Sequence, residues 1–241
     1  MSLHGRIAVV TGASSGIGAA VAEALAEAGA SLVLAARRLE RLEDLAGRLR
    51  ARGAIVAPHR TDVTREADVA ALFAGVDAQF GRLDLLVNCA GIADHTPTEH
   101  LSLSRWREVL DTNLTSAFLC GREALVRMKR QKRGRIIFIG SISAKSPRPD
   151  AIAYTATKFA LDGMTRSLAL DARGDGIAVS ILHPGSTVTE LVPNMAGRPK
   201  ADSMSAADVA RAVLLMASLP DEVNFLEALM LPLGQPFLGR G

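Results

Sequence analysis

The chain has 241 residues, of which 49% are hydrophobic and 22% are charged, and its formal net charge is +3. This composition is ordinary for a globular protein, and the mild basicity is spread along the chain and is weak evidence for a polyanionic partner. Two isolated cysteines without metal-ligand spacing argue against a zinc site, and no apolar run approaches the ~20 residues of a membrane span. We therefore expect no metal, no nucleic-acid partner and no membrane partner.

The cysteines and the N-terminus indicate where the protein works. Cys89 and Cys120 are isolated, as is typical of reduced thiols in the cytosol. The first residues lead directly into a strand pattern and carry no secretory signal. We therefore expect a cytoplasmic protein.

Short apolar segments alternate with longer amphipathic ones along the whole chain. The apolar segments show no polar alternation, which is typical of parallel strands that are buried on both faces. Predicted strands occupy 6–11, 31–36, 54–59, 83–88, 135–140, 177–182 and 226–233. Predicted helices occupy 16–30, 39–53, 66–80, 103–130, 152–173 and 205–219. This order predicts an α/β fold: one Rossmann-type doubly wound parallel sheet of about seven strands, with helices on both faces, in a single domain spanning 1–241.

A glycine-rich loop follows the first predicted strand and opens the first predicted helix. The sequence there reads T-G-x-x-x-G-x-G, with Gly12, Gly16 and Gly18. Glycines at these points permit a tight turn and a close approach of the backbone to a pyrophosphate. The helix N-terminus adds free N–H groups and partial positive charge. The loop therefore predicts a dinucleotide site.

The end of the second predicted strand indicates which dinucleotide is bound. Arg37 and Arg38 stand there, and no acid follows until Glu40. An acid at this point holds the ribose 2′-hydroxyl of NAD, whereas arginine accepts the 2′-phosphate of NADP. Ser14 in the glycine loop offers a further hydroxyl. We expect NADP(H), with NAD(H) less favoured.

Three residues near the middle of the chain suggest proton transfer. Tyr154 is the only tyrosine, Ser141 precedes it by 13 residues, and Lys158 follows it by 4. Residues four apart share one helix face, and a neighbouring cation favours the ionised form of a phenol. Tyr154 and Ser141 can then serve the same substrate oxygen.

Later in the chain, the Pro/Gly-rich segment 186–204 follows the sixth predicted strand. It lies on the side where such sheets bind ligands, so we expect a lid over the substrate. The basic segment 127–135 has no interleaved aromatic residues, so we interpret it as a solvated helix end.

These motifs together resemble the classical short-chain dehydrogenase/reductase family over nearly the whole chain. Besides the glycine loop, the sequence carries "DV" at 62–63, "NCAG" at 88–91, Asn113, "SIS" at 141–143, "YTATK" at 154–158 and "HPGSTVTE" at 183–190, in the family's order and spacing. The C-terminal stretch resembles the branch of 3-hydroxy acid dehydrogenases and clavulanate-type aldehyde reductases.

The resemblance implies a role for each catalytic position. Tyr154 would be the general acid/base, Lys158 would bind the nicotinamide ribose and assist Tyr154, Ser141 would orient the substrate, and Asn113 would hold a water of a proton relay. The implied activity is NADP(H)-dependent hydride transfer between the nicotinamide and a ketone, aldehyde or secondary alcohol.

The resemblance also implies binding residues. Cofactor contacts are expected at Gly12, Ser14, Ser15, Gly16, Ile17, Gly18, Arg37, Arg38, Asp62, Val63, Asn88, Ala90, Gly91, Tyr154, Lys158, Pro184, Gly185, Thr187 and Thr189. The substrate is expected to meet Ala93, Asp94, His95, Ser143, Pro149, Ser186, Leu191 and Met195. This set is mostly apolar and contains no arginine to hold a carboxylate, which favours bulkier neutral carbonyl substrates.

Two other functions stay open. A 3-oxoacyl-[acyl-carrier-protein] reductase would suit the basic segment 127–135, since carrier proteins are acidic. A catalytically silent NADPH-sensing regulator is of another class, although the presence of all four catalytic positions argues against it. The family resemblance further implies a homotetramer, with a dimer as the second choice.

Overall fold

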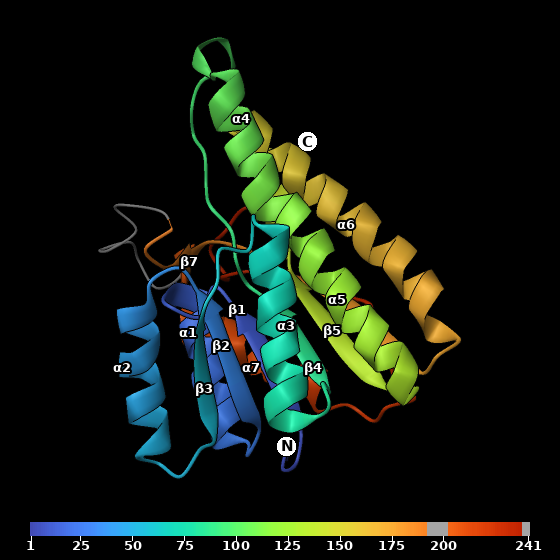
Figure 1. The fold of residues 1–241 in the computed structure, drawn as a ribbon. Helices are drawn as coiled ribbons and strands as arrows, with labels where there is room; N and C mark the ends of the chain where they lie inside the picture. The colour runs from blue at the N-terminus through green and yellow to red at the C-terminus, as the bar shows by residue number, and fades with distance from the viewer. Residues whose placement is uncertain (192–201, 238–241) are drawn as a thin grey trace.

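The computed structural model describes residues 1–191 and 202–237, and Figure 1 shows helices on both faces of a central sheet. The strands are β1 (Ile7–Thr11), β2 (Ser31–Ala36), β3 (Val56–Arg60), β4 (Leu85–Asn88), β5 (Gly134–Ile139), β6 (Ile177–Pro184) and β9 (Glu227–Met230), with a separate short pair of β7 (Thr187–Val188) and β8 (Met204–Ser205). The helices are α1 (Gly16–Glu27), α2 (Leu39–Arg50), α3 (Glu66–Phe80), α4 (Leu103–Leu110), α5 (Ser116–Gln131), α6 (Ile152–Arg173) and α7 (Ala206–Ala217). Short turns form η1 (Thr98–His100), η2 (Asp111–Thr115) and η3 (Ile142–Ala144).

The central sheet confirms the predicted fold class. Its seven strands are all parallel and follow the order β3-β2-β1-β4-β5-β6-β9. Most strand residues are buried, as expected for a sheet that is covered on both faces. The absence of polar alternation in the strands follows from this arrangement.

Two separate apolar layers hold the helices against the sheet. Helices α1, α2 and α7 pack on one face, where Leu25 and Leu34 are fully buried. Helices α3, α5 and α6 pack on the other face, around Phe73 and Phe138. These side chains remove large apolar areas from water, which is the main stabilising contribution to such a fold.

The strand order creates a crevice at the carboxyl edge of the sheet. From β1 the chain first builds β2 and β3 on one side, and then returns to place β4 on the other side of β1. Thr11 at the end of β1 lies in register with Asn88 at the end of β4. Ligands of doubly wound sheets bind at such a reversal point.

Two segments differ in detail from the sequence prediction. The helix predicted over 103–130 consists of α4, the π-helical turn η2 and α5. The segment 186–204 begins with β7, which pairs in parallel with β8 near its other end. Residues 192–201 of that segment lie outside the described part of the chain, so its expected role as a lid stays a prediction.

One end of the molecule projects beyond the carboxyl edge of the sheet. Figure 1 shows α4 there, alongside the start of α6.

In the part of the chain that the structure describes, no helix is long and apolar enough to cross a membrane.

Candidate functional site

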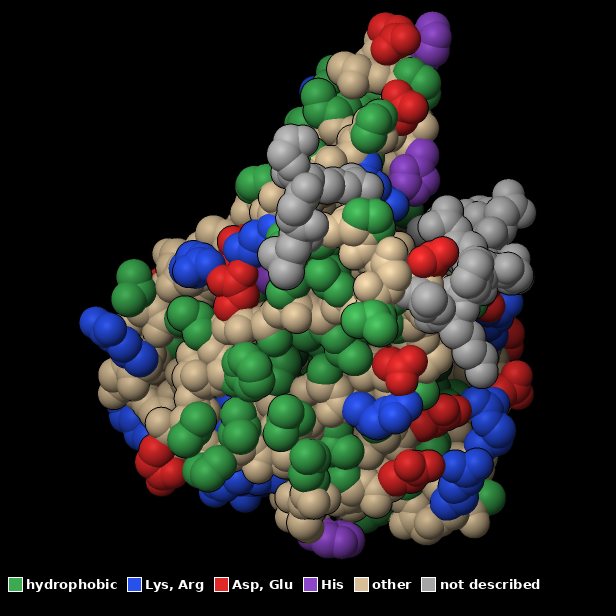
Figure 2. Space-filling view, turned by 180° about the vertical axis from the view of Figure 1, so that it is seen from behind, with side chains coloured by type: hydrophobic (Ala, Val, Ile, Leu, Met, Phe, Trp, Pro, Cys, Tyr) green, Lys and Arg blue, Asp and Glu red, His purple; other side chains and the backbone are tan. Residues whose placement is uncertain are grey.

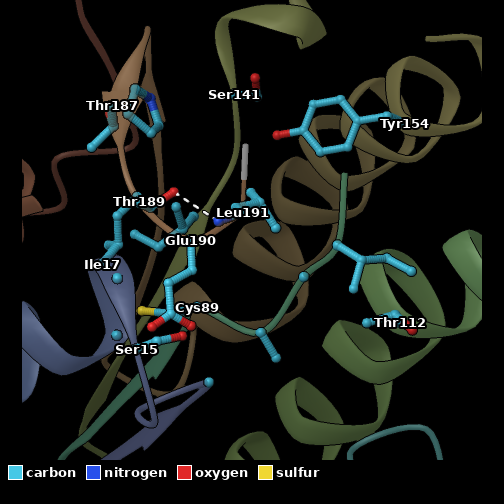
Figure 3. Close-up of a pocket in the computed structure, with 18 of the residues that line it drawn as sticks. Ser15, Ile17, Cys89, Thr112, Ser141, Tyr154, Thr187, Thr189, Glu190 and Leu191 are labelled. Atoms are coloured by element: carbon cyan, nitrogen blue, oxygen red, sulfur yellow. Dashed lines mark hydrogen bonds between the residues drawn. The ribbon is translucent and has the colours of Figure 1, made fainter. Parts of the chain in front are cut away.

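A cavity of about 500 Å³ opens at the carboxyl edge of the strands. It runs from the glycine loop and the ends of β2 and β3 to the start of α6 and the segment after β6. Of the residues predicted to bind the cofactor, all except Asn88 line this cavity. Figure 3 shows part of the lining, with Ser15 and Ile17 at one end and Ser141 and Tyr154 at the other.

The backbone of the glycine loop approaches its neighbours so closely that side chains would not fit. A Cβ atom on Gly12, which has φ +66°, would lie 2.9 Å from the backbone of Ala90. A Cβ atom on Gly18 would lie 2.3 Å from the carbonyl oxygen of Gly12. The loop therefore leaves open backbone and the N-terminus of α1 facing the cavity, a cradle that suits the pyrophosphate of a dinucleotide.

Arg38 connects α2 to the glycine loop. Its guanidinium donates to Ser14 Oγ over 3.2 and 3.0 Å and to Ser15 Oγ over 2.8 Å. Arg37 lines the same end of the cavity. Cationic and hydroxyl donors thus gather where β2 ends, and such donors suit a phosphate group.

Asp62 lines the cavity together with Arg37 and Thr64. Burial raises the pKa of Asp62, but hydrogen bonds from Thr64 lower it more, with a smaller contribution from the charge of Arg37, so that its pKa lies below the usual range. Asp62 is therefore ionised at neutral pH and can accept hydrogen bonds.

The catalytic candidates meet at the other end of the cavity. Lys158 donates from Nζ to the carbonyl oxygen of Ile139 over 2.9 Å, and Nζ lies 5.5 Å from the centroid of the Tyr154 ring. Ser141 follows β5, and its Oγ accepts the N–H of Ser143 over 3.1 Å. Figure 3 shows the phenol oxygen of Tyr154 pointing toward Ser141. The structure thus brings together three of the four predicted catalytic residues.

Asn113, the fourth of them, lies just behind the cavity wall in the π-helical turn η2. Its Oδ1 accepts the N–H of Ile92 over 2.7 Å, and its Nδ2 donates to the carbonyl oxygen of Ile92 over 2.9 Å and to Thr157 Oγ1 over 3.3 Å. Thr157 in turn donates to the carbonyl oxygen of Tyr154 over 2.7 Å. Asn113 therefore ties the loop after β4 to the first turns of α6.

Asn88 is buried beneath the cavity, where it bonds the end of β1. Its Oδ1 accepts the hydroxyl of Thr11 over 2.8 Å, while Thr11 Oγ1 accepts the N–H groups of Cys89 and Ala90 over 3.2 and 3.3 Å. Cys89 lines the cavity, and burial raises the pKa of its thiol to about 12. This thiol is therefore protonated and a poor nucleophile.

The predicted substrate residues divide into three groups. Ser186 and Leu191 line the cavity. Met195 lies outside the described residues. The others do not line this cavity: Ala93, Asp94, His95, Ser143 and Pro149.

The position of Asp94 has a clear physical reason. Asp94 is 5% exposed, accepts from Arg105 Nε over 2.7 Å and also accepts the N–H of Thr96 over 3.1 Å. Burial raises the pKa of Asp94, but the hydrogen bonds from Arg105 and Thr96 lower it more. Asp94 is therefore an ionised structural residue that anchors α4.

Sequence reasoning missed several polar residues of the cavity, namely Thr61, Thr64, Thr112, Arg148, Glu190 and Gln235. Arg148 lies on the loop between Ser141 and α6, so the expectation of a cleft without arginine was wrong. Gln235 approaches from the C-terminal segment, where its Oε1 accepts the N–H of Ser186 over 2.7 Å. The signal in the sequence that could have indicated Arg148 was its place in the loop between Ser141 and Tyr154.

Comparison with known proteins gives consistent results. Residues 6–199 match the family model described as short chain dehydrogenase. The cis-4-hydroxycyclohexanecarboxylate dehydrogenase of Sinomonas cyclohexanicum is 40% identical over 219 residues, which cover 90% of this chain and 86% of that protein. Glycine betaine reductase of Emericella nidulans is 34% identical over 97% of this chain, but the match spans only 19% of that longer protein.

A solved structure of a dehydrogenase has a similar fold. An alcohol dehydrogenase from the archaeon Thermococcus sibiricus, complexed with 5-hydroxy-NADP, superposes with a TM-score of 0.90 and 30% identity. The match covers 96% of this chain and 98% of that one. With a glycine-loop cradle, a Tyr154–Lys158 pair on one helix and a family match over most of its length, this chain belongs to the short-chain dehydrogenase family of oxidoreductases.

Proposed function

We propose that this short-chain dehydrogenase is an NADP(H)-dependent oxidoreductase that interconverts a carbonyl compound and the corresponding alcohol. The observation that carries the proposal is the convergence of Ser141, Tyr154 and Lys158 on the cavity that the glycine loop also lines. A nicotinamide cofactor bound there would supply or accept the hydride.

The proton chemistry follows from the residues of the chain. In the reductive direction, Tyr154 donates its phenol proton to the substrate oxygen, and Ser141 donates a hydrogen bond to the same oxygen and orients it. Lys158 lies beside the phenol and stabilises the negative charge that Tyr154 acquires. In the oxidative direction, Tyr154 takes the proton back from the alcohol.

The preference for NADP(H) is supported by the donors at the end of β2. Arg37 and Arg38 line the cavity, and Arg38 is already bonded to Ser14 and Ser15. A 2′-phosphate gains charge-assisted hydrogen bonds from such a group. The similar archaeal structure is titled a complex with 5-hydroxy-NADP, which agrees with this choice of cofactor.

For the substrate, Arg148 favours a hydroxy or oxo compound that carries an anionic group. Arg148 lines the cavity, and the described residues form no ion pair with it. The name of the relative from Sinomonas cyclohexanicum includes a carboxylate, cis-4-hydroxycyclohexanecarboxylate, in agreement with this interpretation.

The test is NADPH consumption against ketones, oxo acids, aldehydes and acyl thioesters, with Tyr154→Phe measured in parallel. Turnover that Tyr154→Phe abolishes while NADPH still binds supports the proposal. Turnover that survives this substitution contradicts the role given to Tyr154. Tight binding of NADPH without turnover of any substrate favours the alternative of an NADPH-sensing regulator.

The other candidates have less support. The comparisons do not favour a 3-oxoacyl-[acyl-carrier-protein] reductase. Assignment to the branch of 3-hydroxy acid dehydrogenases and clavulanate-type aldehyde reductases stays a prediction, as does a cytoplasmic location.

For the assembly we propose a homotetramer, with a dimer as the second choice. Large apolar side chains are exposed on the outer helices: Phe118, Val126, Phe159 and Leu170. A second set belongs to the C-terminal segment: Phe225, Leu226, Leu229 and Leu233. Figure 2 shows hydrophobic side chains spread across the rear face of the molecule. Surfaces of this kind are typical of contacts between subunits, and light scattering on the purified chain measures the assembly directly.

A further inference from the structure

At the end of the cavity lined by Ser15 and Arg38, two arginines hold a carboxylate of the chain itself. Arg41 Nη1 lies 2.7 Å from Glu190 Oε1 and 2.9 Å from Oε2, and Arg38 Nη1 lies 3.2 Å from Oε2. Arg38 and Arg41 stand at the start of α2, whereas Glu190 follows β7. Figure 3 shows Glu190 extending from its segment toward the glycine loop around Ser15.

The same guanidinium that holds Glu190 also bonds the glycine loop. Arg38 donates to the hydroxyls of Ser14 and Ser15 through its Nε and Nη2, while its Nη1 faces Glu190. Two guanidiniums thus face one anion position, two hydroxyls bond one of these guanidiniums, and Glu190 lines the cavity there. This donor set suits a phosphate group, for which a carboxylate is the nearest equivalent among side chains.

We propose that Glu190 competes with the 2′-phosphate of NADPH for this anion position, and that Arg41 is part of the phosphate site. The inference rests on the proposed NADP(H) dependence. When a 2′-phosphate binds, Arg38 and Arg41 turn their donors to it and Glu190 moves away. NADH carries no 2′-phosphate, so its binding leaves the Glu190 ion pairs intact.

The competitor is present at neutral pH. Hydrogen bonds from Arg41 and then from Arg38 hold the pKa of Glu190 below the usual range, so its carboxyl group is charged. The charged groups that face it are these two arginines, and both ion pairs are partly exposed, with 57% of the Glu190 side chain accessible. Exposed ion pairs are weak, so a phosphate dianion can replace the carboxylate. The expected effect on affinity is about three- to tenfold.

The test is the substitution Glu190→Gln, with binding of NADPH and NADH measured by fluorescence titration. Binding of NADPH should tighten about three- to tenfold, while binding of NADH should change less than about twofold. Glu40→Gln is the matched control. Glu40 is exposed and lies next to Arg41 in the first turn of α2, and the substitution removes one negative charge, as Glu190→Gln does. Glu40→Gln should leave the ratio of the two affinities unchanged.

A second variant tests Arg41. Arg41→Met should weaken NADPH binding about three- to tenfold and leave NADH binding unchanged, because only the phosphate contact is lost. The inference is overturned if Glu190→Gln leaves NADPH binding unchanged, weakens it, or tightens NADH equally.

A cofactor fragment separates this inference from the proposed cofactor preference. Adenosine 2′,5′-bisphosphate and AMP differ only in the 2′-phosphate, and calorimetry measures their binding without any turnover. A wild-type chain that binds NADH more tightly than NADPH would contradict the proposed NADP(H) dependence. Tighter binding of the bisphosphate to the Glu190→Gln chain, with AMP unchanged, would still support the competitor; equal binding to both chains would refute it.

Discussion

The ammonium group of Lys158 lies 5.5 Å from the centroid of the Tyr154 ring, and the carbonyl oxygen of Ile139 holds it in place. A cation beside a phenol favours the ionised phenol. We expect Lys158→Met to lower the rate of alcohol oxidation about a hundredfold at neutral pH, within the usual contribution of acid–base catalysis. The loss is expected because the ammonium group that stands beside the Tyr154 ring, and that would balance negative charge on it during proton transfer, is then absent. Steady-state kinetics measure the rate, the exposed Lys132→Met is the control, and an unchanged rate in Lys158→Met would contradict the role of Lys158.

Substitution of Arg148 should divide substrates by charge. Arg148→Ala should raise KM for a hydroxy or oxo acid about 10- to 100-fold, because a charge-assisted hydrogen bond contributes about 1.5–3 kcal/mol. The methyl ester of the same compound keeps its shape and loses its charge, so its KM should stay the same. Steady-state kinetics on the acid and ester measure the difference. An equal loss for both compounds would show that Arg148 shapes the cavity and does not bind an anion.

Loss of Arg105 should destabilise the fold. Asp94 is buried, and Arg105→Met would leave its carboxylate without its main partner. We expect a loss of about 1–3 kcal/mol in the free energy of unfolding, since a buried charged group is costly to leave unpaired and Arg105 is itself partly exposed. Urea denaturation measures the loss, and Arg107→Met on the exposed face of the same helix should cost far less.

His183 should make stability depend on pH. The ring is fully buried, and its Nδ1 lies 3.0 Å from the carbonyl oxygen of Ser141. Burial, and then the charge of Lys145, lower the pKa of His183 below 6.5, although Asp162 and Glu227 also face the ring and oppose this shift.

The sign of the effect follows from proton binding. Below about pH 6.5 the unfolded chain takes up a proton on His183 that the folded chain does not. The contribution of His183 to the free energy of unfolding should therefore be fully present above about pH 6.5 and should fall as the pH is lowered below that value. In His183→Gln this slope should be smaller, whereas the exposed His100→Gln should keep it. The test is the free energy of unfolding measured at several pH values. If its dependence on pH were the same in His183→Gln as in the wild-type chain, the prediction would be wrong.

The sequence predicted the sheet well because each buried strand is uniformly apolar and each helix keeps its own periodicity. It did not show the π-helical turn at Asp111–Thr115, since helical spacing continues on both sides of it. Asp94 was expected in the cleft, yet Arg105, eleven residues later, binds it and holds it in the interior. Arg148 and Arg41 could not be assigned from local pattern, because only the folded chain brings Arg148 to the cavity and Arg41 to Glu190.

The hydrogen bonds of Asn113 have a consequence for how this enzyme could diversify. They join the loop after β4 to α6, and through Thr157 they reach the backbone of Tyr154. The backbone of Tyr154 is thus held by bonds that do not involve Arg148. Under the proposed function, Arg148 could therefore be exchanged without moving Tyr154, and a change of substrate charge would require few substitutions.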